Sequence, residues 1–557
     1  MKKWYMLLTG IFLLSASLWV APLPAAAPMV LAPGETAIVR VYYPNPEMGN
    51  KTLISFEAQL LETNYGKGYH VMRVTREDVD RLTAAGLRVV PDDAWTASPP
   101  EATADDEEDD TVIPKYPCYR TVEATFDTAA TLAEMYPILV EWIDVGDSWE
   151  KTDSPGVRGY DMLVLKLTNR DILDDNKPVL LITAAMHARE YATAELVTRF
   201  GEYLVSNYGL DPDVTWILDH HEIHLMLQTN PDGRKQAESG LSWRKNTNET
   251  YCLEDPDNRG ADLNRNFSFA WNCCDGSSDD ACNATYHGMF ATSEPEIQAV
   301  EAYMEMIFPD QREDDRDSPA PAEATGIYID VHSYGKLVLW PWGSTGDLPP
   351  NATQLQTLGR KFAYWNDYSP EQAIGLYPTD GTSDEHAYGH LGVASYCFEV
   401  GTSFFQPCNR FEKTIVPDNL PALLYAAKVV RTPYMTPAGP DAMNLSVGSD
   451  PVPAGTPAAL TATIDDTRYR ILRGNVENEP VQNIAAAEFY IDTPPWAGGV
   501  GLTMDPGDGA FNTTVETVTA EIDTAGLEAG RHLVFVRGQD ENGNWGAFSA
   551  VFLTITE

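Results

Sequence analysis

The chain has 557 residues, and its 38 Lys and Arg against 82 Asp and Glu give a formal net charge of −44. At roughly 150 residues per domain, this length predicts three or four domains. The acidic balance argues against a nucleic-acid-binding protein, because such proteins need a basic surface. With 43% hydrophobic and 10% aromatic residues, the chain can form large packed cores, which excludes a wholly disordered protein.

Residues 1–27 have the layout of a cleaved secretory signal. Lys2 and Lys3 precede an apolar stretch that ends in the small residues Ala25–Ala27. We therefore expect a secreted, extracellular protein, with cell-surface association as a further option. The alternative is an uncleaved membrane anchor, because Trp4–Val20 is about long enough to span a bilayer. We find no later apolar run of that length, so we expect no membrane span in the mature chain.

Residues 28–95 are predicted to form a small α+β domain. Strand-like segments at 36–43 and 69–74 are followed by a helix predicted over 75–85. The next residues, 96–115, contain prolines and a run of acidic side chains, which is typical of an exposed linker. This arrangement suggests a prodomain on a cleavable tether.

Residues 116–436 alternate amphipathic helices with short apolar strands. Helices are predicted over 128–142, 190–206, 294–307 and 420–430. Strands are predicted over 162–168, 179–186, 223–230, 326–333 and 395–400. The alternation predicts an α/β domain with a mixed, mostly parallel sheet sandwiched by helices. Such sheets place their functional residues at the ends of strands.

Residues 437–557 follow a Pro-rich segment and show strand-length alternation with turn signals. They contain no convincing helical pattern. This composition predicts a C-terminal β-sandwich of the Ig-like or fibronectin-like kind.

A candidate metal site begins at the end of the strand 179–186. His187 and Glu190 follow it directly and can turn toward one cation, although a His and a Glu at this spacing also occur by chance in many helices. Zinc catalysis uses neutral imidazoles and a carboxylate and keeps one position open. His332, at the end of the strand 326–333, is the best third ligand, because it would emerge at the same edge of the sheet.

A rival group of histidines lies in the segment DHHEIHLMLQTN. We interpret these residues as strand histidines, because no carboxylate completes a sensible ligand set with them. They are His220, His221 and His224.

Nine short motifs then follow in a recognisable order. They are HARE (187–190), NPDG (230–233), WRK (243–245), DLNRNF (262–267), TYHG (285–288), SEPE (293–296), HSY (332–334), LYPTDGTSD (376–384) and CFEVG (397–401). Over about residues 116–436 the chain resembles the zinc metallocarboxypeptidases, most of all their secreted bacterial carboxypeptidase T-type members. Nine motifs in the family's order make chance convergence negligible.

The resemblance implies one zinc ion per chain, held by the ligand set proposed above, His187, Glu190 and His332. It implies Asp262 as the carboxylate that holds a ligating imidazole in one tautomer, a role expected for any zinc-bound histidine. Glu399 matches the residue that takes the proton of the attacking water and returns it to the leaving amine. A structural Ca²⁺ is an option for which the sequence gives no ligand set.

The resemblance also implies how the substrate is held. Arg244 matches the arginine that stabilises the oxyanion. Asn264 and Arg265 match the pair that binds the terminal carboxylate, which an arginine fork can contact through both oxygens. Tyr377 matches a mobile tyrosine that closes over the same group. Ser383 matches the residue that contacts the departing side chain.

The chain departs from the family pattern at two places. Glu385 and His386 replace the usual aromatic residue of the specificity loop, and residues 309–323 look like an inserted acidic loop. Since Ser383 offers only a hydroxyl, we expect a preference for neutral, apolar or aromatic terminal residues. A negative charge supplied by Asp384 or Glu385 would instead favour Lys and Arg.

The sequence therefore predicts a secreted zinc carboxypeptidase, made as a proenzyme, that acts on the C-termini of peptides or proteins. One alternative is a peptidase of the same fold that cuts peptidoglycan stem peptides. Another is an inactive surface protein whose C-terminal sandwich contacts a cell surface or carbohydrate.

Seven cysteines in an exported protein favour disulfides over thiols, and one must remain over or pair between chains. The resemblance suggests a bridge between Cys252 and Cys282, although the adjacent Cys273 and Cys274 make that pairing uncertain. Cys397 and Cys408 are close enough in sequence to clip the loop after Glu399.

Overall fold

The computed structural model describes the greater part of the chain. The described residues are 31, 35–45, 48–49, 51–52, 56, 59–64, 67–92, 110–154, 156–174, 176–470 and 481–557. The predicted signal 1–27 and most of the predicted linker, 96–109, lie outside them. Across these described ranges, no helix combines the length and the apolar character that a membrane crossing requires.

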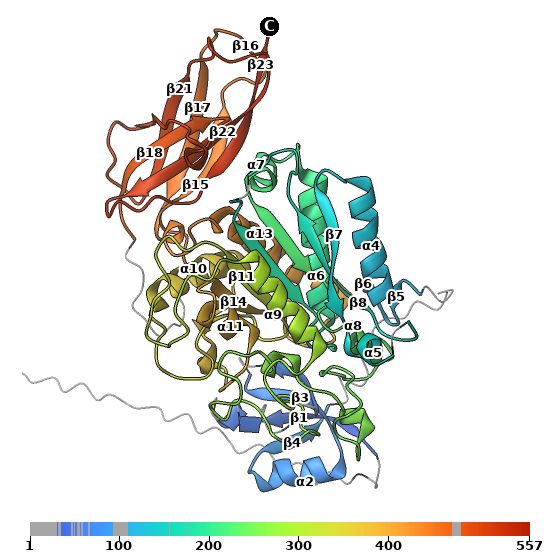
Figure 1. The fold of residues 1–557 in the computed structure, drawn as a ribbon. Helices are drawn as coiled ribbons and strands as arrows, with labels where there is room; N and C mark the ends of the chain where they lie inside the picture. Colours follow the sequence, from blue (N-terminus) through green and yellow to red (C-terminus); the bar gives the residue numbers. More distant parts are fainter. Residues whose placement is uncertain are drawn as a thin grey trace, which may run out of the picture.

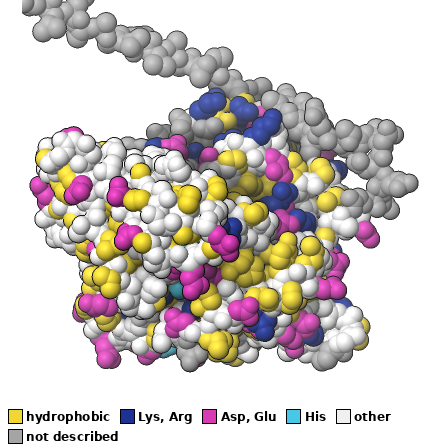
Figure 2. Space-filling view, turned by 90° about the horizontal axis from the view of Figure 1, so that it is seen from above, with side chains coloured by type: hydrophobic (Ala, Val, Ile, Leu, Met, Phe, Trp, Pro, Cys, Tyr) yellow, Lys and Arg dark blue, Asp and Glu magenta, His cyan; other side chains and the backbone are white. Residues whose placement is uncertain are grey.

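Three units follow one another along the chain (Figure 1). The N-terminal unit lies below the central unit in this view, and the C-terminal unit lies above it, so the two flank the central domain at different ends. In the face shown in Figure 2, acidic, basic and hydrophobic side chains are interspersed. On this face the strong negative charge is spread out and does not form one patch.

The N-terminal unit is a four-stranded antiparallel sheet with one helix against it. Its strand order is β2-β3-β1-β4. The strands are β1 (Ala37–Tyr42), β2 (Leu60–Asn64), β3 (Tyr69–Val74) and β4 (Arg88–Pro91). Helix α2 (Arg76–Ala84) begins at a capping box in which Thr75 and Asp78 bond each other's backbone N–H groups. The sheet leaves β2 as an edge strand.

The central domain contains an eight-stranded mixed sheet in the order β13-β12-β14-β11-β9-β10-β8-β7. The strands are β7 (Val140–Asp147), β8 (Asp161–Leu167), β9 (Val179–Ala184), β10 (Glu222–Met226), β11 (Ile327–His332), β12 (Leu337–Trp340), β13 (Ser369–Gln372) and β14 (Ala394–Glu399). The inner strands β10, β9, β11 and β14 run parallel. The predicted mixed, mostly parallel sheet is confirmed.

Helices cover both faces of this sheet (Figure 1). The main ones are α4 (Val122–Met135), α6 (Tyr191–Asn207), α7 (Pro212–His220), α8 (Pro231–Glu238), α9 (Pro295–Ile307), α10 (Ala352–Asn366), α11 (Ser383–Gly389) and α13 (Val416–Val429). Alternate residues of β9 serve the two faces: Leu180 and Ile182 pack with α6, whereas Val179 and Leu181 pack with α9. A strand buried on both sides explains its unbroken apolar sequence.

The helix predicted over 128–142 is wrong at its end. Helix α4 stops at Met135, and residues from Val140 form β7. Pro137 explains the stop, because a proline has no N–H to continue the helix and disfavours helical backbone at the residue before it.

The C-terminal unit is a β-sandwich, as predicted. One sheet has the order β15-β17-β21-β20 and the other β16-β23-β22-β18-β19. Their strands are β15 (Asp441–Val447), β16 (Val452–Pro453), β17 (Ala458–Asp465), β18 (Ile484–Ile491), β19 (Leu502–Thr503), β20 (Asp505–Pro506), β21 (Val515–Ile522), β22 (Gly530–Asp540) and β23 (Ser549–Thr556). Alternate residues of β17, Leu460, Ala462 and Ile464, fill the shared core.

Three disulfides join six of the cysteines. The predicted bridge between Cys252 and Cys282 is confirmed. The predicted clip between Cys397 and Cys408 is wrong, because Cys408 bonds Cys118 with a Cα–Cα distance of 5.5 Å. Cys397 is a buried free thiol of β14 that packs against Leu337, Leu339 and Ala373.

The third bridge joins the adjacent Cys273 and Cys274.

Candidate active site

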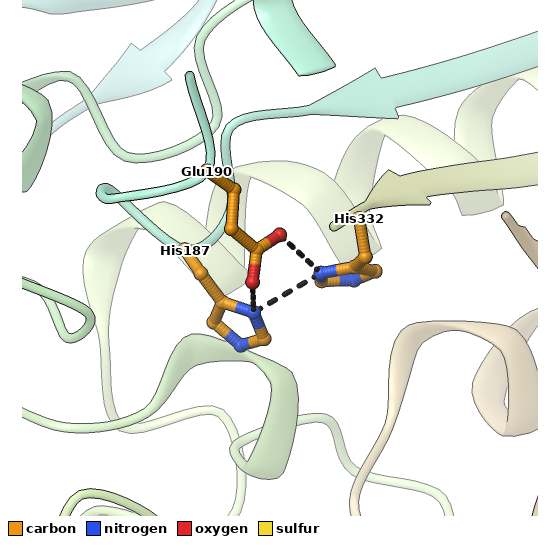
Figure 3. A group of neighbouring side chains, drawn as sticks. All are labelled: His187, Glu190 and His332. Atoms are coloured by element: carbon orange, nitrogen blue, oxygen red, sulfur yellow. Dashed lines mark hydrogen bonds and ion pairs between the residues drawn. The ribbon is translucent and has the colours of Figure 1, made fainter. Parts of the chain in front are cut away.

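The candidate metal ligands come from two neighbouring parallel strands. β9 ends at Ala184, and the segment from His187 to Glu190 leads into α6, whereas His332 is the last residue of β11. In the sheet, Ala184 lies opposite Val331, the residue before His332. Because the carboxyl ends of parallel strands meet at one edge, the three side chains converge there (Figure 3).

The three ligand atoms lie within 4.8 Å of one another, and all three residues are buried. His187 Nδ1 is 2.8 Å from Glu190 Oε1, and His332 Nδ1 is 3.1 Å from Glu190 Oε2. The two Nδ1 atoms are 3.0 Å apart. Two imidazoles and a carboxylate aimed at one point form a donor set that suits zinc.

Each imidazole is held from behind by a carboxylate. Asp262 Oδ1 is 3.1 Å from His187 Nε2, and Asp330 Oδ2 is 2.9 Å from His332 Nε2. A proton shared at each Nε2 leaves the Nδ1 lone pair free for a metal. Asp262 was predicted for this role. The sequence analysis missed Asp330, although its place two residues before His332 on one strand puts both side chains on the same face.

The surroundings of Glu190 favour its ionised form. Burial would raise the pKa of Glu190, but His187 and His332 hold it below its usual range. The ionised carboxylate is the form of Glu190 that can bind a divalent cation.

Glu399 lies beside the ligands because β14 is the next parallel strand, with Glu399 opposite His332. Burial, and then the charge of Glu190, raise the pKa of Glu399 to about 7. Its Oε2 has no hydrogen-bond partner among the described residues. A carboxyl group that changes protonation near neutral pH is suited to proton transfer.

Arg244 lies next to the same ligands. Its Nε and Nη2 donate to Asp262 Oδ2 at 3.1 Å and 2.7 Å, and its Nη1 donates to His187 Nδ1 at 3.3 Å. One carboxylate, Asp262, therefore orients both the guanidinium and an imidazole.

The predicted carboxylate-binding residues line the same pocket. Asn264 Nδ2 is 3.1 Å from His332 Nε2. Arg265 is 2% exposed and donates from Nε to the Gly276 carbonyl at 3.1 Å. The Arg265 guanidinium lies 6.0 Å from the centre of the Tyr377 ring.

The pocket wall contains Asp384, whereas Ser383 faces away from it. The Ser383 hydroxyl donates to Asp330 Oδ2 at 2.6 Å, so its side chain supports the carboxylate behind His332. Asp384 is 5% exposed, and its Oδ2 has no hydrogen-bond partner among the described residues. Burial raises the pKa of Asp384. Asp384, and not Ser383, therefore lines the pocket.

The pocket is narrow, with a volume of about 70 Å³. On this measure a single water molecule needs about 10–15 Å³, so the free space holds a few water molecules. Leu60 of the N-terminal strand β2 is part of its lining, next to Tyr334 and Phe404.

The rival histidines lie elsewhere. His224 is in β10, as expected, and contacts Glu222 and Tyr303. His220 and His221 are at the end of helix α7, where a strand was expected. His187, Glu190 and His332 are the one group of this kind in the part of the chain that the structure describes.

Comparisons with known proteins agree with this site. A family model described as zinc carboxypeptidase matches residues 126–420, more than half of the chain. A zinc carboxypeptidase of Saccharothrix mutabilis subsp. capreolus is 30% identical over 304 residues, covering 51% of this chain and 62% of the relative. Carboxypeptidase A1 of Bos taurus is 28% identical over 296 residues, covering 51% of this chain and 63% of the relative. The chain thus spans less than two thirds of these relatives.

Solved structures show the same fold. Carboxypeptidase A from Helicoverpa armigera has a TM-score of 0.56 at 21% identity, covering 70% of this chain and 97% of that one. The thrombin activatable fibrinolysis inhibitor has a TM-score of 0.55 at 21% identity, covering 71% and 99%. The buried His–Glu–His group lies inside the region that the family model matches. The resemblance seen in the motifs is therefore confirmed, and the chain belongs to the zinc carboxypeptidase family.

Proposed function

We propose that this protein is a secreted zinc-dependent carboxypeptidase that hydrolyses the last peptide bond of peptides or proteins. The observation that carries the proposal is the convergence of His187, Glu190 and His332 with Glu399 and Arg244 on one buried pocket. When bound, zinc supplies a Lewis acid that polarises a carbonyl oxygen and lowers the pKa of a water molecule.

The chain's own side chains supply the other parts of the reaction. Glu399, with its pKa near neutrality, accepts a proton from the attacking water and passes it to the leaving amine. Arg244 stabilises the negative charge that develops on the carbonyl oxygen. Asn264 and Arg265 bind the free carboxylate of the terminal residue, which makes the enzyme an exopeptidase.

The exopeptidase assignment is tested with peptides that have either a free or an amidated C-terminus. Wild-type protein is expected to release the terminal residue from the free acid alone. Arg265→Ala should raise KM for the free acid by about tenfold to a hundredfold, because the anion loses its bidentate partner. If this variant treats both peptides as the wild type does, the exopeptidase assignment fails.

We further propose that the departing residue is Lys or Arg. Asp384 is a buried carboxylate on the pocket wall with an oxygen that has no partner among the described residues. An unpaired buried charge is costly, and a cationic side chain from the substrate would compensate it.

The N-terminal domain is proposed to block this pocket. Its strand β2 pairs with the catalytic domain through an antiparallel bridge between Glu62 and Ser403. The Thr63 hydroxyl is 3.0 Å from the Tyr334 hydroxyl. Tyr377 packs against the core of the N-terminal domain, so the tyrosine expected to move over a substrate is held by the prodomain.

Cutting the linker between residues 105 and 115 should therefore raise activity by about tenfold or more. The cut lets the N-terminal domain leave, so the population shifts from the state with a blocked pocket to the state with an open pocket. Leu60→Asp is expected to raise the activity of the uncut chain, since it places a charge in the apolar contact with Phe404. Glu77→Ala, on the exposed side of α2, is the matched control. Equal activity of the cut and uncut wild-type chains would disprove the block.

A further inference from the structure

A short loop beside Arg265 begins with a disulfide between the adjacent residues Cys273 and Cys274. This loop, residues 273–276, packs on Asp380 of the segment 376–384. Asp380 is fully buried, and its Oδ2 accepts hydrogen bonds from Cys274 N at 3.1 Å and Gly276 N at 2.9 Å. One carboxylate oxygen thus fixes the backbone of the loop at two points.

The same loop holds Arg265. The Gly276 carbonyl accepts from Arg265 Nε at 3.1 Å, and Arg265 Nη1 donates to its own neighbour, the Asn264 carbonyl, at 2.6 Å. These contacts set the plane of the guanidinium, so moving Gly276 would turn Arg265 in the pocket. Arg265 and Asp380 are linked through a single residue, Gly276, which bonds both.

The packing at Gly276 leaves little room for adjustment. A Cβ atom there would lie 2.3 Å from the Thr379 carbonyl carbon and 2.6 Å from Asp380 N. Only glycine allows the loop to approach Asp380 this closely. The bond between Cys273 and Cys274 further restricts the loop, because it ties two consecutive side chains to each other.

We propose that Asp380 is a positioning residue for the substrate's terminal carboxylate, acting on Arg265 through the loop 273–276. The inference rests on the proposed role of Arg265. Asp380 itself does not line the pocket, and the hydrogen bonds of its Oδ2 go to the backbone of the loop and not to His187, Glu190 or His332. Its loss should therefore disturb substrate binding while the metal site and the proton transfer persist.

The test compares steady-state kinetics of Asp380→Ala and Asp380→Asn on free-acid peptides that end in Lys or in Leu. Asp380→Ala should raise KM about tenfold for both peptides, with kcat and zinc content within about twofold of wild type. An equal rise in KM for both peptides distinguishes this role from that proposed for Asp384, whose loss should affect only peptides that end in a basic residue. Asp380→Asn keeps an acceptor oxygen and should recover most of the loss.

Asp232→Ala is the matched control. Asp232 is a buried carboxylate that also accepts from a backbone N–H, that of Glu150 at 2.8 Å, and it is not part of the pocket. Its removal should leave KM unchanged. The double variant Cys273→Ser/Cys274→Ser should raise KM in the same direction as Asp380→Ala, and the two changes together should be less than additive because they act through one loop.

The inference is overturned if Asp380→Ala raises KM no more than Asp232→Ala does, or if it lowers kcat and zinc content instead. If Asp380→Ala does not fold, an unchanged KM in the double cysteine variant overturns it equally. The proposed function fails separately, when Arg265→Ala leaves the discrimination between free and amidated peptides intact. If Arg265→Ala raises KM and Asp380→Ala leaves KM unchanged, the inference about Asp380 is wrong while the proposed function stands.

Discussion

Glu399→Gln is expected to lower kcat by about 10²–10⁴-fold while the zinc stays bound. Glutamine keeps the shape of the side chain but cannot accept a proton at neutral pH. Glu399 stands opposite His332 on the next strand and is not one of the three ligands, so metal content should not change. The measurement is kcat together with metal analysis of the purified variant.

Two further variants serve as controls for this measurement. His187→Ala should lose both zinc and activity, because it removes a ligand atom. Cys397→Ser changes a neighbour on the same strand that also lines the pocket, and it should keep most of kcat. Zinc loss in Glu399→Gln equal to that in His187→Ala would place Glu399 among the ligands and refute its role in proton transfer.

Asp384→Asn is expected to reduce kcat/KM for peptides ending in Lys or Arg by about a hundredfold, which corresponds to about 2.7 kcal/mol of lost transition-state binding. Peptides ending in Leu should be cleaved as well as before or better, since the pocket no longer buries a charge. Because burial raises the pKa of Asp384, the wild-type preference for basic residues should weaken as the pH falls and the carboxyl group takes up a proton.

Ser383→Ala separates the two assignments of the specificity residue. The Ser383 hydroxyl bonds Asp330, which in turn holds His332, so its removal should affect zinc affinity more than substrate preference. Ser383 would be the specificity residue if the wild-type protein released terminal Leu and Phe faster than terminal Lys and Arg. The same conclusion would follow if Ser383→Ala changed the preference and Asp384→Asn did not.

The metal ligands could be predicted from sequence because each follows a strongly apolar strand. The ends of such strands meet at one edge of a sheet, and this rule brought His187 and Glu190 to His332 across more than a hundred residues of chain. Asp330 could have been found by the same approach. It shares a strand face with His332, and a carboxylate in the apolar segment IYIDVH needs a partner.

Other features depended on information that local sequence does not contain. Neighbouring residues of the short helix α11 point in different directions, so a difference of one position decides whether Ser383 or Asp384 lines the pocket. The disulfides show the same limit. Cys397 and Cys408 are near in sequence, but Cys397 packs with Leu337 and Leu339 at the pocket, whereas Cys408 bonds Cys118 of β6 (Tyr116–Arg120).

The bond between Cys118 and Cys408 turns almost the whole catalytic domain into a covalent ring, because the two residues are 290 positions apart. Closing a loop of this size stabilises a fold by about 6 kcal/mol in the chain-entropy account. A peptide bond broken anywhere inside the ring leaves both pieces attached, whereas a break in the acidic linker lies outside it and frees the N-terminal domain. A single cut in the linker therefore separates the N-terminal domain, whereas a single cut inside the ring leaves the catalytic domain in one covalent piece.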